Sequence, residues 1–291
     1  MYNAISANKR NTVIIMAVFV GVVAAVGWAI SAYFGNTWIT PWVILGAGIY
    51  ALIQYFAASK LAVAMTGAQE IQKRDNPRLW RIVENLSITN GMPMPKVYII
   101  DDPAPNAFAT GRDPQHAIVA ATTGILDIMS DRELNAVMAH EMGHVKNYDI
   151  RVSMIAFGLA SAIGILCDIV MHIMWFGGGD RDNRNPVMMV IGIAVIVLAP
   201  VTAALIQSAV SRQREYLADA TGAMTTRDPE ALASALEKLQ QAGRPMQRQS
   251  TATAHLFFSN PLKSGGIANL FSTHPPLEDR IARLRNKLTQ M

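Results

Sequence analysis

The chain has 291 residues, of which 51% are hydrophobic and only 16% are charged, and its mean hydropathy is +0.23. Soluble domains carry about 25% charged residues, so this composition excludes an ordinary soluble protein and indicates membrane-spanning segments. The net charge is +4, but Lys and Arg do not cluster with aromatic residues, which argues against nucleic acid as a partner. The single cysteine, Cys167, lies in an apolar run and excludes an intrachain disulfide.

Two apolar runs near the N-terminus predict a transmembrane hairpin. The first, from Thr12 to Phe34, gives about 34 Å of helix at 1.5 Å per residue, which is enough to cross a bilayer. The second extends from Trp38 to Ser59 after a short turn. Basic residues flank the open end of the hairpin, so the positive-inside rule places both ends and the following segment in the cytoplasm. These residues are Lys9, Arg10, Lys60, Lys73 and Arg74.

After this hairpin the composition becomes that of a soluble segment with helices and strands. A helix that begins with an N-cap and a first-turn proline is predicted from Asn76 to Leu86. Short strands are predicted over Lys96–Ile100 and His116–Ala121, separated by a loop that holds Asn106–Gly111. We expect the His116–Ala121 strand to present an edge to an extended peptide.

The next segment, Ser130–Asn147, has the apolar spacing of an amphipathic helix and contains an H-E-x-x-H motif. His140 and His144 share one helix face, so both imidazoles can bind one zinc ion, and Glu141 can then take a proton from a zinc-bound water. Ser130 and Glu133 form a capping-box pattern, which places the histidines well inside the helix. A chance match is the alternative, and its expectation is on the order of a few per thousand.

Two further apolar runs, Val152–Phe176 and Val187–Val210, predict a second transmembrane hairpin around the polar turn Gly177–Asn185. The predicted topology therefore has four spans and both termini in the cytoplasm. The domain prediction follows from it: residues 1–59 and 152–210 form the two hairpins, and residues 60–151 and 211–291 form the two parts of a catalytic domain. The fold class is α+β, mainly helical, with a small β-sheet.

Asp168 and His172 lie one turn apart inside the third apolar run. Ionisable residues within a membrane segment indicate a functional site. The alternative, which we favour, is that both lie near the outer end of the span, where water or each other can satisfy them.

A catalytic zinc ion keeps three protein ligands, so the histidine pair needs a partner. Glu215 is the best candidate because its segment, R-Q-R-E-Y-L-A-D, continues from the fourth apolar run as a helix. Asp219 lies one turn further on the same face and can accept the free ring N–H of a zinc-binding histidine. An interfacial salt bridge with Arg212 or Arg214 is the alternative role for Glu215. Three other glutamates lack such an acidic neighbour and compete less well as the third ligand: Glu230, Glu237 and Glu278.

Four motifs in order make the chain resemble the HtpX-type membrane metallopeptidases of the M48 family. They are H-E-M-G-H at 140–144, R-Q-R-E-Y-L-A-D at 212–219, N-A-F-A-T-G at 106–111 and T-H-P-P-L-E-D-R-I at 273–281. The resemblance covers essentially the whole chain, including both hairpins.

The resemblance implies a gluzincin-like core with one Zn²⁺ per chain, held by His140, His144 and Glu215, and with Glu141 as the catalytic residue. It also implies a supporting role for His274 and Arg280 and a position beside the substrate cleft for Asn106. A bacterial cytoplasmic (inner) membrane is the implied location, and protein quality control under stress is the implied process.

The predicted function is zinc-dependent hydrolysis of peptide bonds in misfolded or damaged membrane proteins, at the cytoplasmic face of the bilayer. Two alternatives stay open: a narrowly specific processing protease, and a non-catalytic membrane adaptor that keeps zinc structurally, with His274 as a fourth ligand. Glu141 ligates nothing in the predicted geometry, which favours an enzyme.

Overall fold

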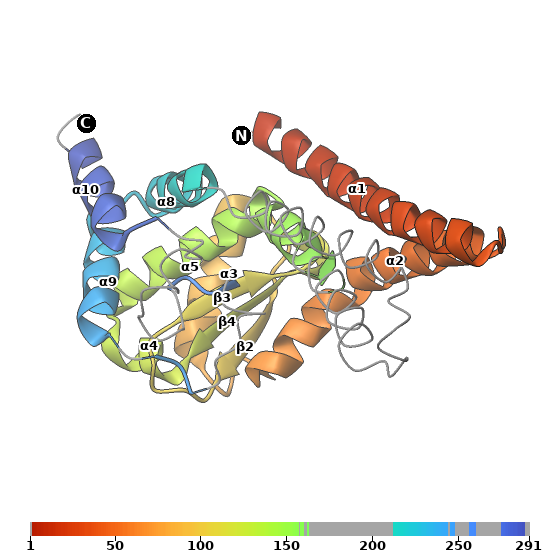
Figure 1. Cartoon of the computed structure of the whole chain (residues 1–291). Coiled ribbons are helices and arrows are strands. Elements are labelled where there is room, and N and C mark those ends of the chain that lie inside the picture. The colour runs from red at the N-terminus through yellow and green to blue at the C-terminus, as the bar shows by residue number, and fades with distance from the viewer. Residues whose placement is uncertain are drawn as a thin grey trace. The chain divides into compact units, whose positions relative to one another are not determined.

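The computed structural model describes residues 2–156, 158–159, 162, 212–243, 245–247, 256–259 and 275–288 (Figure 1). Four residues that the sequence analysis singled out for their chemistry lie outside the described residues: Cys167, Asp168, His172 and His274. The same is true of nearly all of the third and fourth apolar runs.

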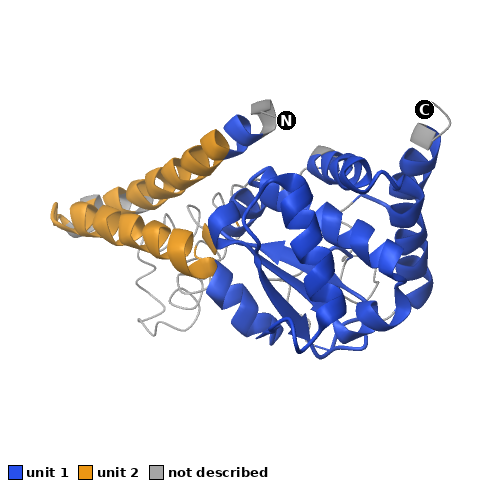
Figure 2. Ribbon diagram, turned by 180° about the vertical axis from the view of Figure 1, so that it is seen from behind, with its two compact units in different colours: residues 1–8, 59–154, 210–291 blue, residues 9–58, 155–209 orange. Residues whose placement is uncertain are grey.

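The chain divides into two compact units (Figure 2). The larger unit contains residues 1–8, 59–154 and 210–291, and the smaller unit contains residues 9–58 and 155–209. Residues 1–8 thus belong to the larger unit, although the sequence analysis grouped them with the first hairpin.

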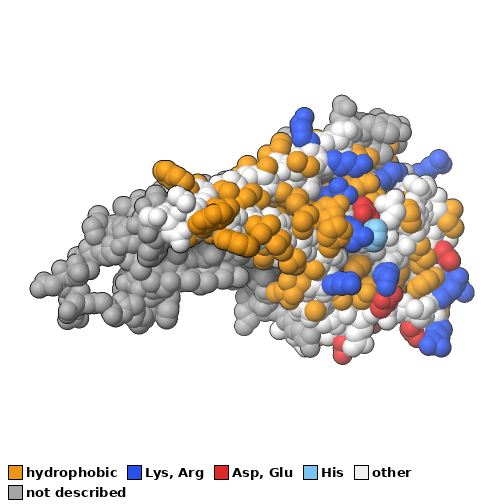
Figure 3. All heavy atoms as spheres, turned by 90° about the vertical axis from the view of Figure 1, so that its right-hand side faces the viewer, with side chains coloured by type: hydrophobic (Ala, Val, Ile, Leu, Met, Phe, Trp, Pro, Cys, Tyr) orange, Lys and Arg blue, Asp and Glu red, His pale blue; other side chains and the backbone are white. Residues whose placement is uncertain are grey.

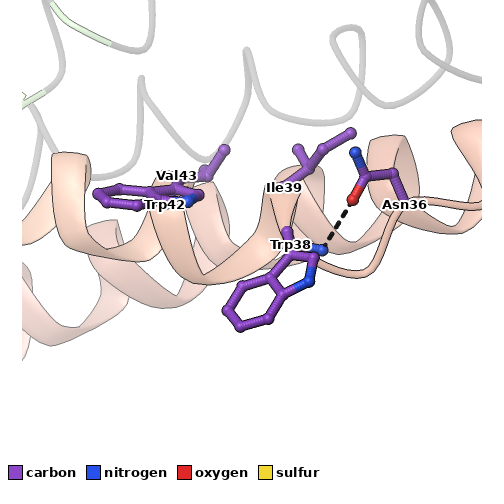
Figure 4. A pocket seen from close by; sticks show the side chains of 5 residues that line it. All are labelled: Asn36, Trp38, Ile39, Trp42 and Val43. Atoms are coloured by element: carbon purple, nitrogen blue, oxygen red, sulfur yellow. Dashed lines mark hydrogen bonds between the residues drawn. The ribbon is translucent and has the colours of Figure 1, made fainter.

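Two long helices, α1 (Tyr2–Phe34) and α2 (Ile39–Thr66), account for most of the described part of the smaller unit. The turn between them uses Gly35 at a φ of 61°, which glycine adopts without strain. Asn36 stabilises the turn, because its side-chain oxygen accepts a hydrogen bond of 3.1 Å from the backbone N–H of Trp38 (Figure 4). Gly27 allows close helix contact, since a Cβ there would lie 2.7 Å from Val43.

Both helices contain a segment that is long and apolar enough to cross a membrane, namely Ile5–Ala25 and Ile39–Thr66. Their apolar side chains are largely exposed; Leu52 and Phe56 each expose 55% of their surface. In the space-filling view, hydrophobic side chains gather in one area and charged side chains in another (Figure 3). An apolar surface of this kind is stable in lipid rather than in water.

The larger unit contains a four-stranded mixed sheet in the order β1-β2-β4-β3. The strands are β1 (Gln69–Glu70), β2 (Lys96–Ile100), β3 (Ala107–Thr110) and β4 (Ile118–Thr122). Strands β2 and β4 are parallel, with Val97 opposite Val119, whereas β3 and β4 are antiparallel.

The sheet order corrects the predicted substrate edge. The predicted strand His116–Ala121 corresponds to β4, which lies between β2 and β3 and is therefore not an edge. His116 itself belongs to a 3₁₀ turn, η1 (Pro114–His116). The edge next to β4 is strand β3, in the segment Asn106–Gly111 that the sequence analysis assigned to a loop. All four residues of β3 are buried, so the strand has no alternation of apolar and polar residues to reveal it.

Six described helices complete the larger unit. They are α3 (Pro77–Asn90), α4 (Thr123–Ile128), α5 (Asp131–Lys146), α8 (Arg212–Thr226), α9 (Pro229–Ala242) and α10 (Leu277–Leu288). Helix α5 packs against the sheet on one side and against α8 and α9 on another (Figure 1). Leu134, Val137 and Met138 of α5 are fully buried there and form part of the main core.

Candidate metal centre

Helix α5 carries both motif histidines in its interior. The Ser130 hydroxyl accepts the backbone N–H of Glu133, and the Glu133 carboxylate accepts the backbone N–H of Ser130, which together form the predicted capping box. His140 and His144 therefore follow about three regular turns of helix and are held by a rigid element. His140 is only 1% exposed.

The structure brings His140, His144 and Glu215 together; Figure 1 shows their helices, α5 and α8. The Nε2 atoms of the two histidines lie 3.1 Å apart. The Glu215 carboxylate lies 3.4 Å from His144 Nε2 and 3.8 Å from His140 Nε2. One ligand atom from each residue falls within 4.8 Å of the other two.

Close packing of α8 on α5 makes this convergence possible. Gly222 of α8 lies against the backbone of His140, and a Cβ at this glycine would be 3.0 Å from the His140 backbone nitrogen. Such a distance is shorter than most real contacts, so a larger residue would push the helices apart. Glu215 lies two turns before Gly222 on the same helix, and its position relative to the histidines depends on this contact.

Each histidine has a carboxylate on its other ring nitrogen. Asp219 lies 2.9 Å from His140 Nδ1, where the sequence analysis expected a histidine partner for it. Asp149 lies 3.1 Å from His144 Nδ1. A carboxylate at Nδ1 fixes the proton on that nitrogen and leaves Nε2 free to bind a metal.

Asp149 was not among the residues predicted from the sequence. On a continuous helix, Asp149 would point well away from His144, because five residues turn the chain by about 500°. Helix α5 instead ends at Lys146, and Tyr148 has a φ of 62°, which turns the chain back. The only sequence signal was an acidic residue shortly after the motif.

Arg280 supports Asp219 from the opposite side. This fully buried arginine donates two hydrogen bonds to Asp219, from Nε at 2.9 Å and from Nη2 at 2.6 Å. Its Nη1 atom lies 3.7 Å from Glu215. The guanidinium thus offsets the charge of two buried carboxylates. Without a cation nearby, burying these charges would be costly.

Glu141 is buried and faces the edge strand. Burial raises the pKa of Glu141 to about 7, and the neighbouring Glu215 carboxylate also raises it. His144, Arg280 and a hydrogen bond from the backbone of Ala109 in β3 act in the opposite direction. A carboxylate with a pKa near neutrality can both accept and release a proton.

The pKa values of the two histidines are shifted in opposite directions. Burial lowers the pKa of His140 to about 4, although Asp219 raises it. Burial also lowers the pKa of His144, but hydrogen bonds with Asp149 and Glu215 outweigh burial and raise it well above its ordinary value. A metal ion bound through His144 would compete with protons for this ring, so acid would weaken its binding.

The free side of β3 contacts a short segment, residues 256–259. The backbone N–H of Phe258 donates to the Ala107 carbonyl at 2.8 Å. The Asn106 side chain donates to the Ser259 carbonyl at 2.8 Å and accepts the Ser259 N–H at 3.1 Å. The Phe258 ring packs edge-on against His140, with 4.8 Å between the ring centroids. Asn106 therefore holds the segment whose Phe258 ring packs against His140.

The donor set fits a divalent metal such as zinc. Two imidazole nitrogens and one carboxylate are the ligand types of open catalytic zinc sites. Glu230 and Glu237, which the sequence analysis weighed as third ligands, pair instead with Arg285. Glu278 accepts a hydrogen bond from Gln240.

Comparisons with known proteins identify relatives of this chain. The model of peptidase family M48 matches residues 73–288. The chain is 56% identical to the "Protease HtpX homolog" of Tropheryma whipplei (strain Twist) over 285 residues, which covers 98% of both chains. It is 45% identical to the protein of the same name from Ligilactobacillus salivarius (strain UCC118), with 98% of this chain and 99% of that one covered.

A crystal structure of S. mikatae Ste24p resembles this chain in fold. The TM-score is 0.54 and the sequence identity is 18%, with 93% of this chain covered. The chain spans 62% of the length of that solved chain.

Proposed function

The chain belongs to peptidase family M48 and is a membrane metalloprotease, and we propose that it is a zinc endopeptidase acting at the cytoplasmic face of a bacterial inner membrane. The observation that carries the proposal is the convergence of His140, His144 and Glu215 beside a buried Glu141. In this proposal the first three residues hold the zinc ion and Glu141 is the catalytic residue.

The zinc ion supplies two effects when bound: it lowers the pKa of a coordinated water and polarises the substrate carbonyl. Glu141 accepts a proton from the attacking water at its carboxylate and delivers it to the leaving amine. Glu141 would take up a proton less strongly with a dication bound nearby, because a positive charge would lower the pKa that burial raises.

We place the extended substrate along β3, the edge strand beside α5, in contrast to the edge expected from the sequence. Ala107 and Ala109 turn their backbone groups away from β4, because the Ala107 carbonyl accepts from Phe258 and the Ala109 N–H reaches Glu141. A substrate strand that pairs with Ala107 replaces the bond from Phe258. Asn106 then offers its side-chain amide to the substrate backbone, as it does to Ser259.

The membrane setting supports a substrate class. The two apolar helices place the protein in a bilayer, and the basic residues at their open end favour a cytoplasmic larger unit. An active site tethered in this way meets misfolded or damaged membrane proteins and their exposed loops. Two further spans over residues 152–210 and a role for His274 belong to the same proposal.

The test uses detergent-purified full chain with zinc restored, and unfolded casein as substrate. Glu141→Gln is expected to lower kcat by at least about 10²-fold while zinc content stays at one per chain. Asp131→Asn, on the exposed first turn of the same helix, is the control and is expected to keep full activity. Equal casein cleavage by Glu141→Gln and the wild type would overturn the catalytic assignment. Absence of cleavage in the zinc-loaded wild type would favour a structural zinc site or a narrow processing role.

A further inference from the structure

Asn8, near the start of α1, contacts the aspartate that pairs with His144. Asn8 is only 5% exposed and belongs to the larger unit. Its side-chain Nδ2 donates one hydrogen bond to Asp149 Oδ1 at 2.7 Å and another to the backbone carbonyl of Asn147 at 2.8 Å. Both N–H bonds of the amide are therefore used.

Asp149 connects Asn8 to a metal-binding histidine. The Oδ1 atom of Asp149 accepts from Asn8, while its Oδ2 atom lies 3.1 Å from His144 Nδ1. The two oxygens of one carboxylate thus have separate partners, and the position of the first fixes the position of the second. Asn147 is the C-cap of helix α5, so the second bond from Asn8 also holds the helix end from which Asp149 follows.

We propose that Asn8 is a positioning residue for the metal site: it orients Asp149, and Asp149 orients the imidazole of His144. This inference rests on the proposed function, since it assumes that His144 is a metal ligand. Asn8 touches neither substrate nor metal, and its effect passes through Asp149.

The chemistry of the amide suits this role. A neutral donor holds the Asp149 carboxylate without neutralising it, so the carboxylate keeps its negative charge for His144. A lysine at this position would compete with His144 for that charge, and an aspartate would repel it. Asparagine can also donate to two acceptors at once, which a serine hydroxyl cannot.

The test measures metal affinity rather than activity alone. Zinc dissociation constants of the full chain in detergent are obtained by competition with a chromophoric chelator. Asn8→Asp, which has the same shape but loses both donors, is expected to weaken zinc binding about tenfold, the lower end of the range for residues that orient metal ligands. Asn8→Ala is expected to weaken binding less, because it adds no repulsion. Ser6→Ala, at an exposed position two residues before Asn8, is the control and is expected to leave the affinity unchanged.

A double-mutant cycle with Asp149→Ala separates positioning from general destabilisation. In the Asp149→Ala background, Asn8→Ala is expected to cause no further loss of zinc affinity, because its effect passes through the removed carboxylate. The visible spectrum of the Co²⁺-substituted protein is expected to change in Asn8→Asp and to stay unchanged in Ser6→Ala.

Wild-type zinc affinity in Asn8→Asp, or fully additive losses in the cycle, would overturn the inference while leaving the proposed function intact. Failure of the proposed function would be recognised differently, because the wild type itself would then not bind zinc or not cleave protein.

Discussion

Two leucines show how differently the two units of this protein are stabilised. Leu134 of α5 is fully buried among protein side chains, whereas Leu52 of α2 exposes 55% of its surface. The apolar face of α5 packs against other parts of the larger unit, whereas α2 is more apolar than α5 and many of its large apolar side chains are exposed among the described residues. The larger unit therefore depends on packing and on paired buried charges, and the smaller unit depends on lipid.

The largest expected effect concerns the buried charges of the larger unit. Arg280→Met leaves the carboxylates of Asp219 and Glu215 buried without their cation, so we expect a loss of about 3–5 kcal/mol in the free energy of unfolding. Arg285→Gln, which breaks surface ion pairs with Glu230 and Glu237, is expected to cost less than about 1 kcal/mol. Chemical denaturation in detergent measures both, and equal losses would contradict the importance of burial.

The leucine pair itself gives the next prediction. Leu134→Ala is expected to lower the free energy of unfolding of the larger unit by about 2–5 kcal/mol, because it leaves a cavity in a packed core. Leu52→Ala removes a side chain with few protein contacts and is expected to change the same quantity by less than about 0.5 kcal/mol. Thermal unfolding of the detergent-solubilised chain measures the difference. A similar cost at both positions would mean that α2 is buried by protein rather than by lipid.

A charge in α2 tests the role of lipid directly. Leu52→Arg is expected to disfavour membrane insertion of this segment by about 3–4 kcal/mol, because it adds the cost of arginine and removes the favourable contribution of leucine. Alkaline extraction of membranes measures the fraction that stays inserted, and Leu52→Ile is the control expected to insert fully. Complete insertion of the arginine variant would show that this face of α2 does not meet lipid.

Acid provides a smaller test of the larger unit. Burial raises the pKa of Glu133, but hydrogen bonds from Lys238, Ser234 and Ser130 outweigh burial and lower it to about 2. Since the folded pKa lies below the unfolded value, this stabilisation is present above about pH 4.5 and is lost as the pH falls toward 2. We expect the loss to be about 1–2 kcal/mol, because Lys238 is partly exposed to solvent. In Glu133→Gln, unfolding measured between pH 6 and 3 is expected to lack this component.

The smallest expected effects come from replacing one glycine in each unit by alanine. Gly91 ends α3 at a φ of 61°, so Gly91→Ala is expected to cost about 1 kcal/mol through backbone strain alone, since the new methyl group meets no atom within 4 Å. Gly21 lies inside helix α1 with similar open space. Gly21→Ala is expected to cause no loss of helix content by circular dichroism, because alanine favours helix.

Local patterns predicted helix α5 and its N-terminal cap well. The spacing of His140 and His144 and the Ser130 capping box depend on neighbours within one or two turns, and α5 has the expected form. The helical fold with a small sheet was also correctly predicted. The predicted edge strand was wrong, because the true edge, β3, has only four residues and is buried on both faces.

The supporting residues follow from contacts that no local pattern contains. Asp149 reaches His144 only because Tyr148 adopts a left-handed conformation that its residue type does not announce. Asn8 reaches Asp149 across 141 positions in the chain. Periodicity identifies helices and their faces, but pairings over such separations are determined by the packed fold.

The order of these residues along the chain has a consequence for biosynthesis. Arg280, which holds Asp219 and lies near Glu215, follows His140 by 140 residues. A ribosome adding about 5–20 residues per second needs about 7–28 s to cover that distance. During this interval the nascent chain carries the histidines without the helix end that completes their surroundings. The surroundings of these histidines are therefore complete only when nearly the whole chain has been made.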